Sequence, residues 1–91
     1  MNKGDLILNV AEKAGISNAA AQRAVNCVFD SIRDSLINGD SARFAGFGTF
    51  DLRDRDARTA RDPRTGAAIE IPAHKVVKFS AGSKLKDSVN Q

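Results

Sequence analysis

The sequence has one cysteine, one histidine and no long apolar run. Cys27 has no second cysteine with which to form an internal disulfide or a zinc site, as is typical of proteins in a reducing compartment. No segment approaches the roughly 18 apolar residues of a membrane span. The first ten residues, MNKGDLILNV, lack the basic start, apolar core and cleavage site of a signal peptide. We therefore expect a soluble, unexported, cytoplasmic protein.

Patterns that indicate catalysis or metal binding are also scarce. His74 is followed by a lysine in an extended segment, where a solvent or ligand contact is expected rather than a general base. Cys27 lies beside an apolar helical stripe, which predicts a small core residue rather than a nucleophile. The aspartates within residues 51–56 alternate with arginines, which favours salt bridges or solvation over a metal site. We expect no enzyme activity, no metal, no cofactor and no small-molecule substrate.

The charge is unevenly distributed along a chain long enough for one domain with a modest core. Residues 1–40 carry four basic and five acidic side chains, whereas residues 53–78 carry five Arg and two Lys against three Asp and one Glu. The second half is therefore positive. Clustered arginine indicates an anionic partner such as nucleic acid or a membrane surface, although a mixed-charge run is also typical of a solvated face.

Helical periodicity dominates residues 1–40. Asn2 is suited to cap a helix over residues 3–14, and Ser17 to cap a second helix that ends at Asn38. The second helix carries an apolar stripe that is wider than the first helix can cover, which predicts a further packing partner. The stripe is formed by Ala21, Ala24, Val25, Val28, Phe29, Ile32 and Leu36.

After residue 40 the pattern changes to strand alternation. SARFA (41–45) and TFDLR (49–53) read as strands joined by the turn GFG, HKVVKFS (74–80) as a returning strand, and residues 83–90 as a short terminal helix. We predict an α+β fold in a single domain, residues 1–91. Its parts are a two-helix base (1–40), an antiparallel sheet with a long protruding ribbon (41–82) and a C-terminal helix (83–91).

The protruding ribbon, residues 53–75, is called the arm below. Its centre reads DPRTG, in which Pro63 suits the first corner of a turn and Gly66 the position that closes it. Nine residues lead out and nine lead back, so at ~3.3 Å per residue each limb can extend roughly 30 Å. An isolated ribbon with so little apolar surface is marginal in water. We predict a mobile arm that becomes ordered on binding.

A slender positive arm suits the minor groove of B-DNA, which is about 6 Å wide and strongly negative. Contacts there carry little sequence information. Pro63 has no N–H to satisfy and is a compact apolar wedge that can enter a base step and bend the duplex. The arm arginines are Arg53, Arg55, Arg58, Arg61 and Arg64.

The stretch GFGTFDLRDRDARTARDPRTGAAIEIP, with VAEKAG before it and LKDSV after it, resembles the HU and integration host factor family of bacterial DNA-bending proteins. The similarity covers essentially the whole chain and is greater to HU. It implies an intertwined homodimer with two arms, or a heterodimer with a paralogue. The implied function is histone-like: low-specificity binding of double-stranded DNA in the nucleoid, and compaction by proline intercalation, with a preference for flexible, nicked or distorted DNA.

The resemblance also implies roles for individual residues. Pro63 would intercalate while the arm arginines contact DNA, and lysines on the body would touch phosphates. Phenylalanines would form the core and the dimer interface rather than base-stacking platforms. The lysines are Lys3, Lys75, Lys84 and Lys86, and the phenylalanines are Phe29, Phe44, Phe47, Phe50 and Phe79.

The sequence departs from the family pattern at a few positions. Asp62 stands where Asn commonly precedes the tip proline, and Asp54 and Asp56 alternate with the arm arginines. These carboxylates predict a modest affinity for DNA. Ser83 follows Gly82 where a Lys or Gln is more usual, so one phosphate contact near the last helix is expected to be missing.

Three other functions remain as alternatives. The first is an integration-host-factor-like subunit that prefers defined DNA sites. The second is a helix-turn-helix regulator, which is disfavoured because its recognition helix would be the apolar, slightly acidic segment after Ser17. The third is an interaction protein whose arm binds another protein or an acidic surface, which indifference to salt would reveal.

Overall fold

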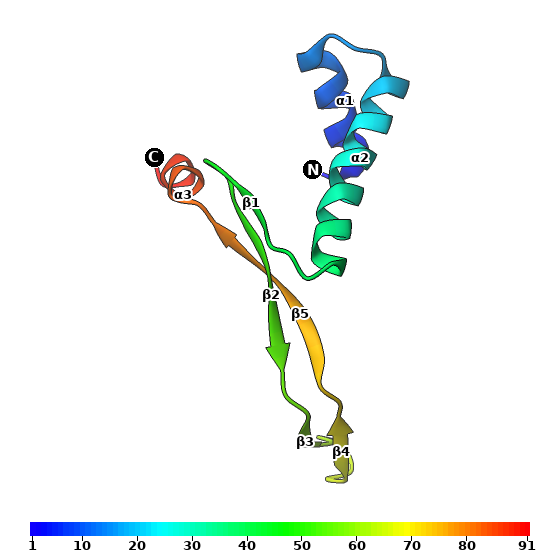
Figure 1. The fold of residues 1–91 in the computed structure, drawn as a ribbon, viewed down its shortest axis with the longest axis vertical. Coiled ribbons are helices and arrows are strands. Elements are labelled where there is room, and N and C mark those ends of the chain that lie inside the picture. Colours follow the sequence, from blue (N-terminus) through cyan, green and yellow to red (C-terminus); the bar gives the residue numbers. More distant parts are fainter. The chain divides into compact units, whose positions relative to one another are not determined.

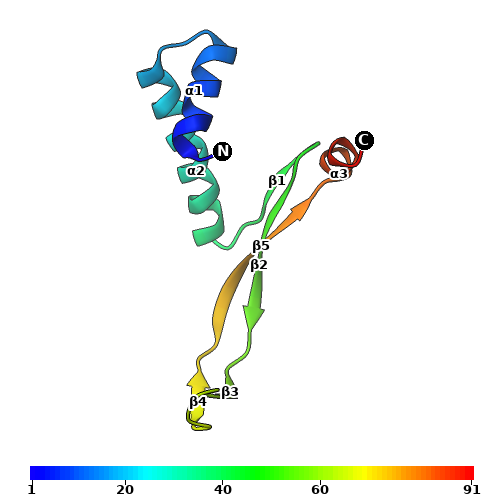
Figure 2. The ribbon, with the colours of Figure 1, turned by 180° about the vertical axis from the view of Figure 1, so that it is seen from behind.

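The computed structural model describes residues 1–91 and divides them into two units, Met1–Asn38 and Gly39–Gln91. The first unit is a pair of helices (Figure 1). The second contains a three-stranded antiparallel sheet, a separate two-stranded ribbon and a short helix, seen from behind in Figure 2. The predicted α+β class is confirmed, and the boundary between the units lies close to the predicted change of pattern after residue 40.

Local capping sets the limits of α1 (Lys3–Ala14). The Asn2 side chain accepts a hydrogen bond from the Asp5 N–H at 2.9 Å, and the Asp5 carboxylate accepts one from the Asn2 N–H at 3.2 Å. Together they form a capping box that satisfies two otherwise unpaired donors. The helix ends at Gly15, whose φ of 66° is the left-handed conformation that glycine adopts without steric cost.

Helix α2 (Asn18–Ile37) begins where Ser17 Oγ accepts a hydrogen bond from the Ala20 N–H at 3.1 Å. Ala21 and Val25, one turn apart, are buried, whereas Val28 and Phe29 are 56% and 45% exposed. The predicted excess of apolar surface on this helix is thus confirmed for the single chain.

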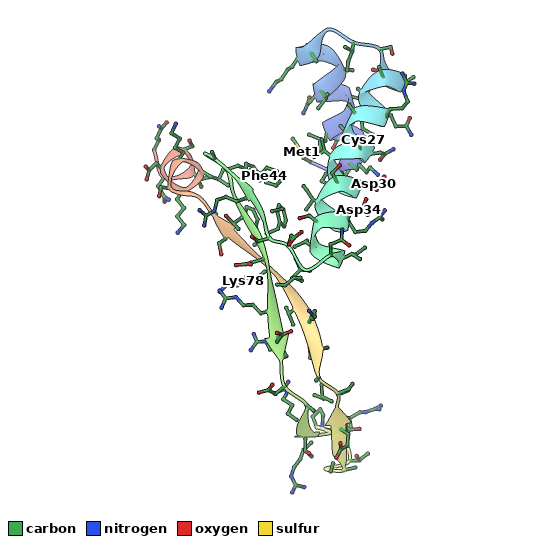
Figure 3. All side chains as sticks on the ribbon, in the orientation of Figure 1. Met1, Cys27, Asp30, Asp34, Phe44 and Lys78 are labelled. Atoms are coloured by element: carbon green, nitrogen blue, oxygen red, sulfur yellow. The ribbon has the colours of Figure 1, made fainter.

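The prediction that Cys27 is a small core residue is wrong, because its side chain is exposed. It lies two residues beyond the buried Val25, which is about 200° around an α-helix. Cys27, labelled on α2 in Figure 3, therefore lies on a different side of the helix from the buried Val25.

The sheet of the second unit has the order β1–β2–β5, with β1 at Ala42–Phe44, β2 at Gly48–Arg55 and β5 at His74–Ala81. Both pairings are antiparallel, and Phe50 of β2 lies opposite Ala42 on one side and Phe79 on the other. Figure 1 shows β2 and β5 side by side along their length. This register brings alternate apolar residues of all three strands to one face.

Four phenylalanines cluster on that face. The ring of Phe50 lies 4.9 Å from Phe79 and 6.4 Å from Phe44, centroid to centroid, and Phe47 lies 5.7 Å from Phe79. These separations and tilted geometries are those of favourable aromatic pairs. Phe44, Phe47 and Phe79 nevertheless remain 40%, 50% and 42% exposed, so the cluster is only partly covered within the chain.

Gly48, buried at the start of β2, is required by close packing. A Cβ at this position would lie 2.6 Å from the Phe79 ring and 2.6 Å from the Ser80 carbonyl oxygen. We expect Gly48→Ala to lower the free energy of unfolding by about 1–3 kcal/mol, the usual cost of overpacking. Urea denaturation at fixed protein concentration measures this.

Gly4→Ala is the matched control for that substitution. The nearest atom to a Cβ at Gly4 is the capping oxygen Asn2 Oδ1 at 3.3 Å, a much milder contact than those at Gly48, and the position is helical. Alanine there should change stability by less than about 1 kcal/mol. Equal losses in the two variants would contradict the packing explanation.

Beyond the sheet, the arm is interrupted. Strands β3 (Arg58–Arg61) and β4 (Ala68–Ile71) pair in a ribbon of their own, called the distal ribbon below. Residues 56–57 and 72–73 belong to no strand, so the continuous limbs predicted from residue 53 to 61 and from 67 to 75 are broken in the middle. Helix α3 (Ser83–Val89) follows β5 at the other end of the sheet, as Figures 1 and 2 show.

Candidate nucleic-acid interface

The two faces of the β2–β5 pair differ in character. Arg53 and Arg55 alternate along β2 with Phe50 and Leu52, so arginine and apolar side chains lie on opposite faces. Register places Lys78 opposite Asp51 on the arginine face. The face that carries the arginines is therefore polar and predominantly basic, while the other carries the phenylalanine cluster.

Two basic residues that sequence reasoning missed belong to this polar face. Arg43 of β1 lies opposite Thr49, and Lys78 of β5 lies opposite Asp51, in the same alternation as Arg53. Both are exposed, and Lys78 is labelled on β5 in Figure 3. Thr49, Asp51 and Arg53 lie on one face of β2 because they alternate along the strand. Arg43 could therefore have been assigned to this face only if its pairing with Thr49 had been known.

Lys75, predicted as a phosphate contact, lies on the other face. Its register partner is Asp54, which alternates with Arg53 and Arg55 along β2. A lysine opposite an aspartate also favours this register electrostatically. Lys75 is exposed, but the sheet does not bring it to the side of the arginines.

In the distal ribbon, arginines occupy both faces. Arg58 pairs with Ile71 on the face that also holds Ile69, whereas Arg61 lies on the face of Glu70. Both arginines are exposed, as are Arg53, Arg55 and Arg64. The ribbon therefore presents positive charge to either side rather than as a single basic stripe.

The tip, residues 62–67, is a tight turn of the predicted kind. Its ends are joined by a hydrogen bond from the Asp62 N–H to the Ala67 carbonyl, and the Gly66 N–H donates to the Asp62 carbonyl, both at 2.8 Å. Gly66 has a φ of 73°, a left-handed conformation that glycine supplies. Pro63 follows Asp62 and is exposed at the end of the arm. The roles predicted for Pro63 and Gly66 in the turn are confirmed.

The remaining predicted lysines lie in two units. Lys3 belongs to the helical unit, where its Nζ lies 6.0 Å from the Phe29 ring centroid, at the limit of a cation–π contact. Lys84 and Lys86 are exposed on α3. The beginning of α3 is tied to the β1–β2 turn by a 2.8 Å hydrogen bond from the Gly82 N–H to the Phe47 carbonyl. The two α3 lysines are therefore anchored beside the sheet.

A hollow of about 570 Å³ lies where the arm is interrupted. His74 at its edge places Nδ1 3.0 Å from the Pro72 carbonyl oxygen. Because a carbonyl only accepts, Nδ1 carries the hydrogen and Nε2 is left for solvent or a ligand. The hollow is lined by Arg55, Asp56, Ala57, Arg58, His74 and Val76.

Other kinds of site find no support in the geometry. No group of three or more His, Cys, Asp or Glu side chains is placed to hold a metal ion. No helix is both long and apolar enough to cross a bilayer. The exposed charged groups of the arm therefore form the principal candidate site.

Comparison with known proteins shows the family of the chain. The family described as "Bacterial DNA-binding protein" matches residues 1–90. DNA-binding protein HU 1 of Bacillus subtilis is 52% identical over 89 residues, which are 98% of this chain and 97% of that protein. The chain belongs to the HU family of bacterial DNA-binding proteins.

Further HU-family comparisons extend over the whole chain. DNA-binding protein HRL18 of Rhizobium leguminosarum is 51% identical over 90 residues, or 99% of each chain. A solved cocrystal of Anabaena HU with DNA superposes with a TM-score of 0.90 at 39% identity, covering 98% of this chain and 97% of that one. HU from Thermotoga maritima superposes with a TM-score of 0.68 at 28% identity, covering 98% of each. The HU fold and a DNA-binding role are thereby established.

Proposed function

We propose that this HU-family chain is an architectural protein that binds double-stranded DNA through the minor groove with low sequence specificity. It bends and compacts DNA by inserting Pro63 from each of two arms, and it acts on the bacterial nucleoid. The observation that carries this proposal is the slender distal ribbon: its arginines are exposed on both faces and its exposed end is a proline in a closed turn.

The dimensions and charge of the distal ribbon favour the minor groove. The minor groove is narrow and strongly negative, so a slender arm with exposed arginines enters it more readily than a globular surface does. Arginines on both faces, such as Arg58 and Arg61, can then approach the two phosphate backbones that flank the groove. Because the groove carries a degenerate pattern of donors and acceptors, these contacts give affinity without strong sequence choice.

Deformability should determine which DNA is preferred. Inserting Pro63 requires a base step to open, and opening costs less where the duplex is flexible, nicked or already distorted. The arm therefore favours such DNA over regular duplex of the same length. Neither a catalytic step nor a cofactor enters this mechanism, and we assign no enzyme activity.

A second copy of the chain completes the proposed assembly. In the helical unit Val28 and Phe29 of α2 are largely exposed, and in the second unit Phe44, Phe47 and Phe79 are between 40% and 50% exposed. The only buried apolar residues are three alanines and one valine, so the chain has little core of its own. Large exposed apolar patches mark association surfaces. We assign these faces to a homodimer interface.

A binding titration tests the proposed function. Three duplexes of equal length are compared, one of random sequence, one nicked and one A/T-rich, each at two salt concentrations. Salt-sensitive binding that is tightest for the nicked duplex is the expected result. A strong preference for one intact sequence would contradict low specificity, and the absence of binding would contradict a DNA partner.

Arg58→Ala should reduce the salt dependence of DNA binding. If Arg58 neutralises a phosphate, its loss flattens the slope of log K against log salt by about 0.9 per contact, or about 1.8 for a homodimer. Arg33→Ala is the control, because Arg33 is an exposed α2 residue paired with Asp30 at 3.1 Å. Equal slopes for Arg58→Ala and the unmodified protein would show that Arg58 does not contact the backbone.

A further inference from the structure

The tip of the arm is held by its own side chains. Pro63, Arg64, Thr65 and Gly66 are all exposed, so no core packing fixes their conformation. Local hydrogen bonds are therefore the interactions available to order the turn. An exposed loop without them would sample many conformations.

Asp62 supplies two of the acceptors that close this turn. Its carbonyl oxygen accepts from the Gly66 N–H at 2.8 Å, and its carboxylate Oδ1 accepts from the Arg64 N–H at 2.8 Å. The second bond is an Asx turn, in which an Asp or Asn side chain replaces a backbone acceptor. Pro63 lies between the two residues that this bond joins, so the bond fixes the peptide groups on both sides of the proline ring.

Two further side chains complete the turn from its other side. The Arg61 guanidinium donates from Nη1 to the Gly66 carbonyl at 3.1 Å. Thr65 Oγ1 accepts from the Ala67 N–H at 3.2 Å. Because a guanidinium has five N–H groups, Arg61 can hold Gly66 and keep donors for a phosphate.

We propose that Asp62, assisted by Arg61, is a positioning residue that presents Pro63 to DNA in a preformed turn. This inference rests on the proposed wedge function of Pro63. Ordering the tip before binding removes an entropic cost that DNA would otherwise have to offset. Asp62 thus opposes binding through its charge and supports it through its hydrogen bond.

The pair Asp62→Asn and Asp62→Ala separates these two effects. Both substitutions remove one negative charge from each arm, but only the asparagine amide oxygen can still accept from the Arg64 N–H. If Asp62 acts only through its charge, both variants bind DNA more tightly and equally. If it positions the tip, Asp62→Ala is the weaker binder of the two.

The experiment compares both variants with the unmodified protein on the nicked duplex. We expect Asp62→Ala to bind more weakly than Asp62→Asn by about two- to tenfold for each arm that engages DNA, the range set by one net hydrogen bond. Energy transfer between dyes at the DNA ends should show a smaller bend for Asp62→Ala and a retained bend for Asp62→Asn. In the free protein, ¹⁵N relaxation should show a lower order parameter at Arg64 only in Asp62→Ala.

The outcomes distinguish this inference from the function on which it rests. Equal affinity, bend and tip order in the two variants would overturn the role of Asp62 while leaving a bending protein. If the unmodified protein neither binds nor bends the duplex, the proposed function fails, and the role of Asp62 in presenting Pro63 fails with it. A lower order parameter at Gly66 in Arg61→Ala but not in Arg58→Ala is expected for the assisting role, and equal values would overturn that part.

Discussion

Replacing Phe47 with aspartate should abolish the proposed dimer. The Phe47 ring is 50% exposed, and its backbone is held by a hydrogen bond from its N–H to the Phe44 carbonyl at 3.0 Å. A partner that covers the exposed half of this ring gains up to about 1.5 kcal/mol of apolar burial. A symmetric interface contains the site twice, so loss of this burial alone raises the dissociation constant by up to about two powers of ten. A buried carboxylate adds a further cost.

Sedimentation equilibrium over a range of concentrations measures the effect. Phe47→Leu is the control, because it keeps an apolar side chain beside the Phe79 ring and should remain dimeric. We expect Phe47→Asp to unfold at a lower temperature than the unmodified protein, because the proposed dimer would supply part of the core. A dimeric mass for Phe47→Asp at micromolar concentration would show that this side chain lies outside the interface.

Pro63→Ala should reduce the bend that the protein imposes on DNA. Apolar wedges of this kind kink a duplex by about 20–90° each, so removing one is expected to cost at least about 20° per arm. Alanine is too small to hold a base step open, and it releases the φ angle that proline fixes. Energy transfer between the two ends of a short nicked duplex reports the change.

Pro72→Ala provides the matched control for the wedge. It is the only other proline, and it lies at the interruption before β5 rather than at the tip. We expect the bend to be unchanged by this substitution. If Pro63→Ala leaves the bend unchanged as well, the wedge mechanism is wrong, whereas similar reductions by both would indicate a general loosening of the arm.

The parts of the fold that local chemistry determines were predicted from the sequence. Asn2 and Ser17 begin the two long helices because short polar side chains cap free N–H groups, and both caps are present. Pro63 and Gly66 define the tip for similarly local reasons. The arm was predicted because its residues offer little apolar surface, and that property needs no knowledge of tertiary contacts.

Features that depend on pairing between distant residues were not predicted. Arg43 and Lys78 join the arginine face only because β1 and β5 pair with β2 in one register, and Lys75 leaves that face for the same reason. Cys27 is adjacent in the sequence to an apolar stripe. Its side chain is nevertheless exposed, because it lies on a side of α2 that α1 does not cover. The break in the arm likewise reflects where two strands stop pairing, which neither strand reveals alone.

The aspartates that weaken the charge of the arm have a second consequence through that register. Asp51 lies opposite Lys78, and Asp54 lies opposite Lys75. Opposite charges directly across an antiparallel pair contribute roughly 0.2–1 kcal/mol. The acids that repel phosphate therefore also favour the alignment that places Lys78 on the face of Arg53 and Arg55.

If the arm binds DNA as proposed, the interruption at residues 56–57 and 72–73 separates its contacts into two parts. No ladder hydrogen bonds join the strands there, and Pro72 has no N–H to offer. In the proposed complex, the distal ribbon could then leave the groove while Arg53 and Arg55 near the sheet stay in place. We expect release to proceed as two small steps in series, so that a bend can relax and re-form many times before the protein departs.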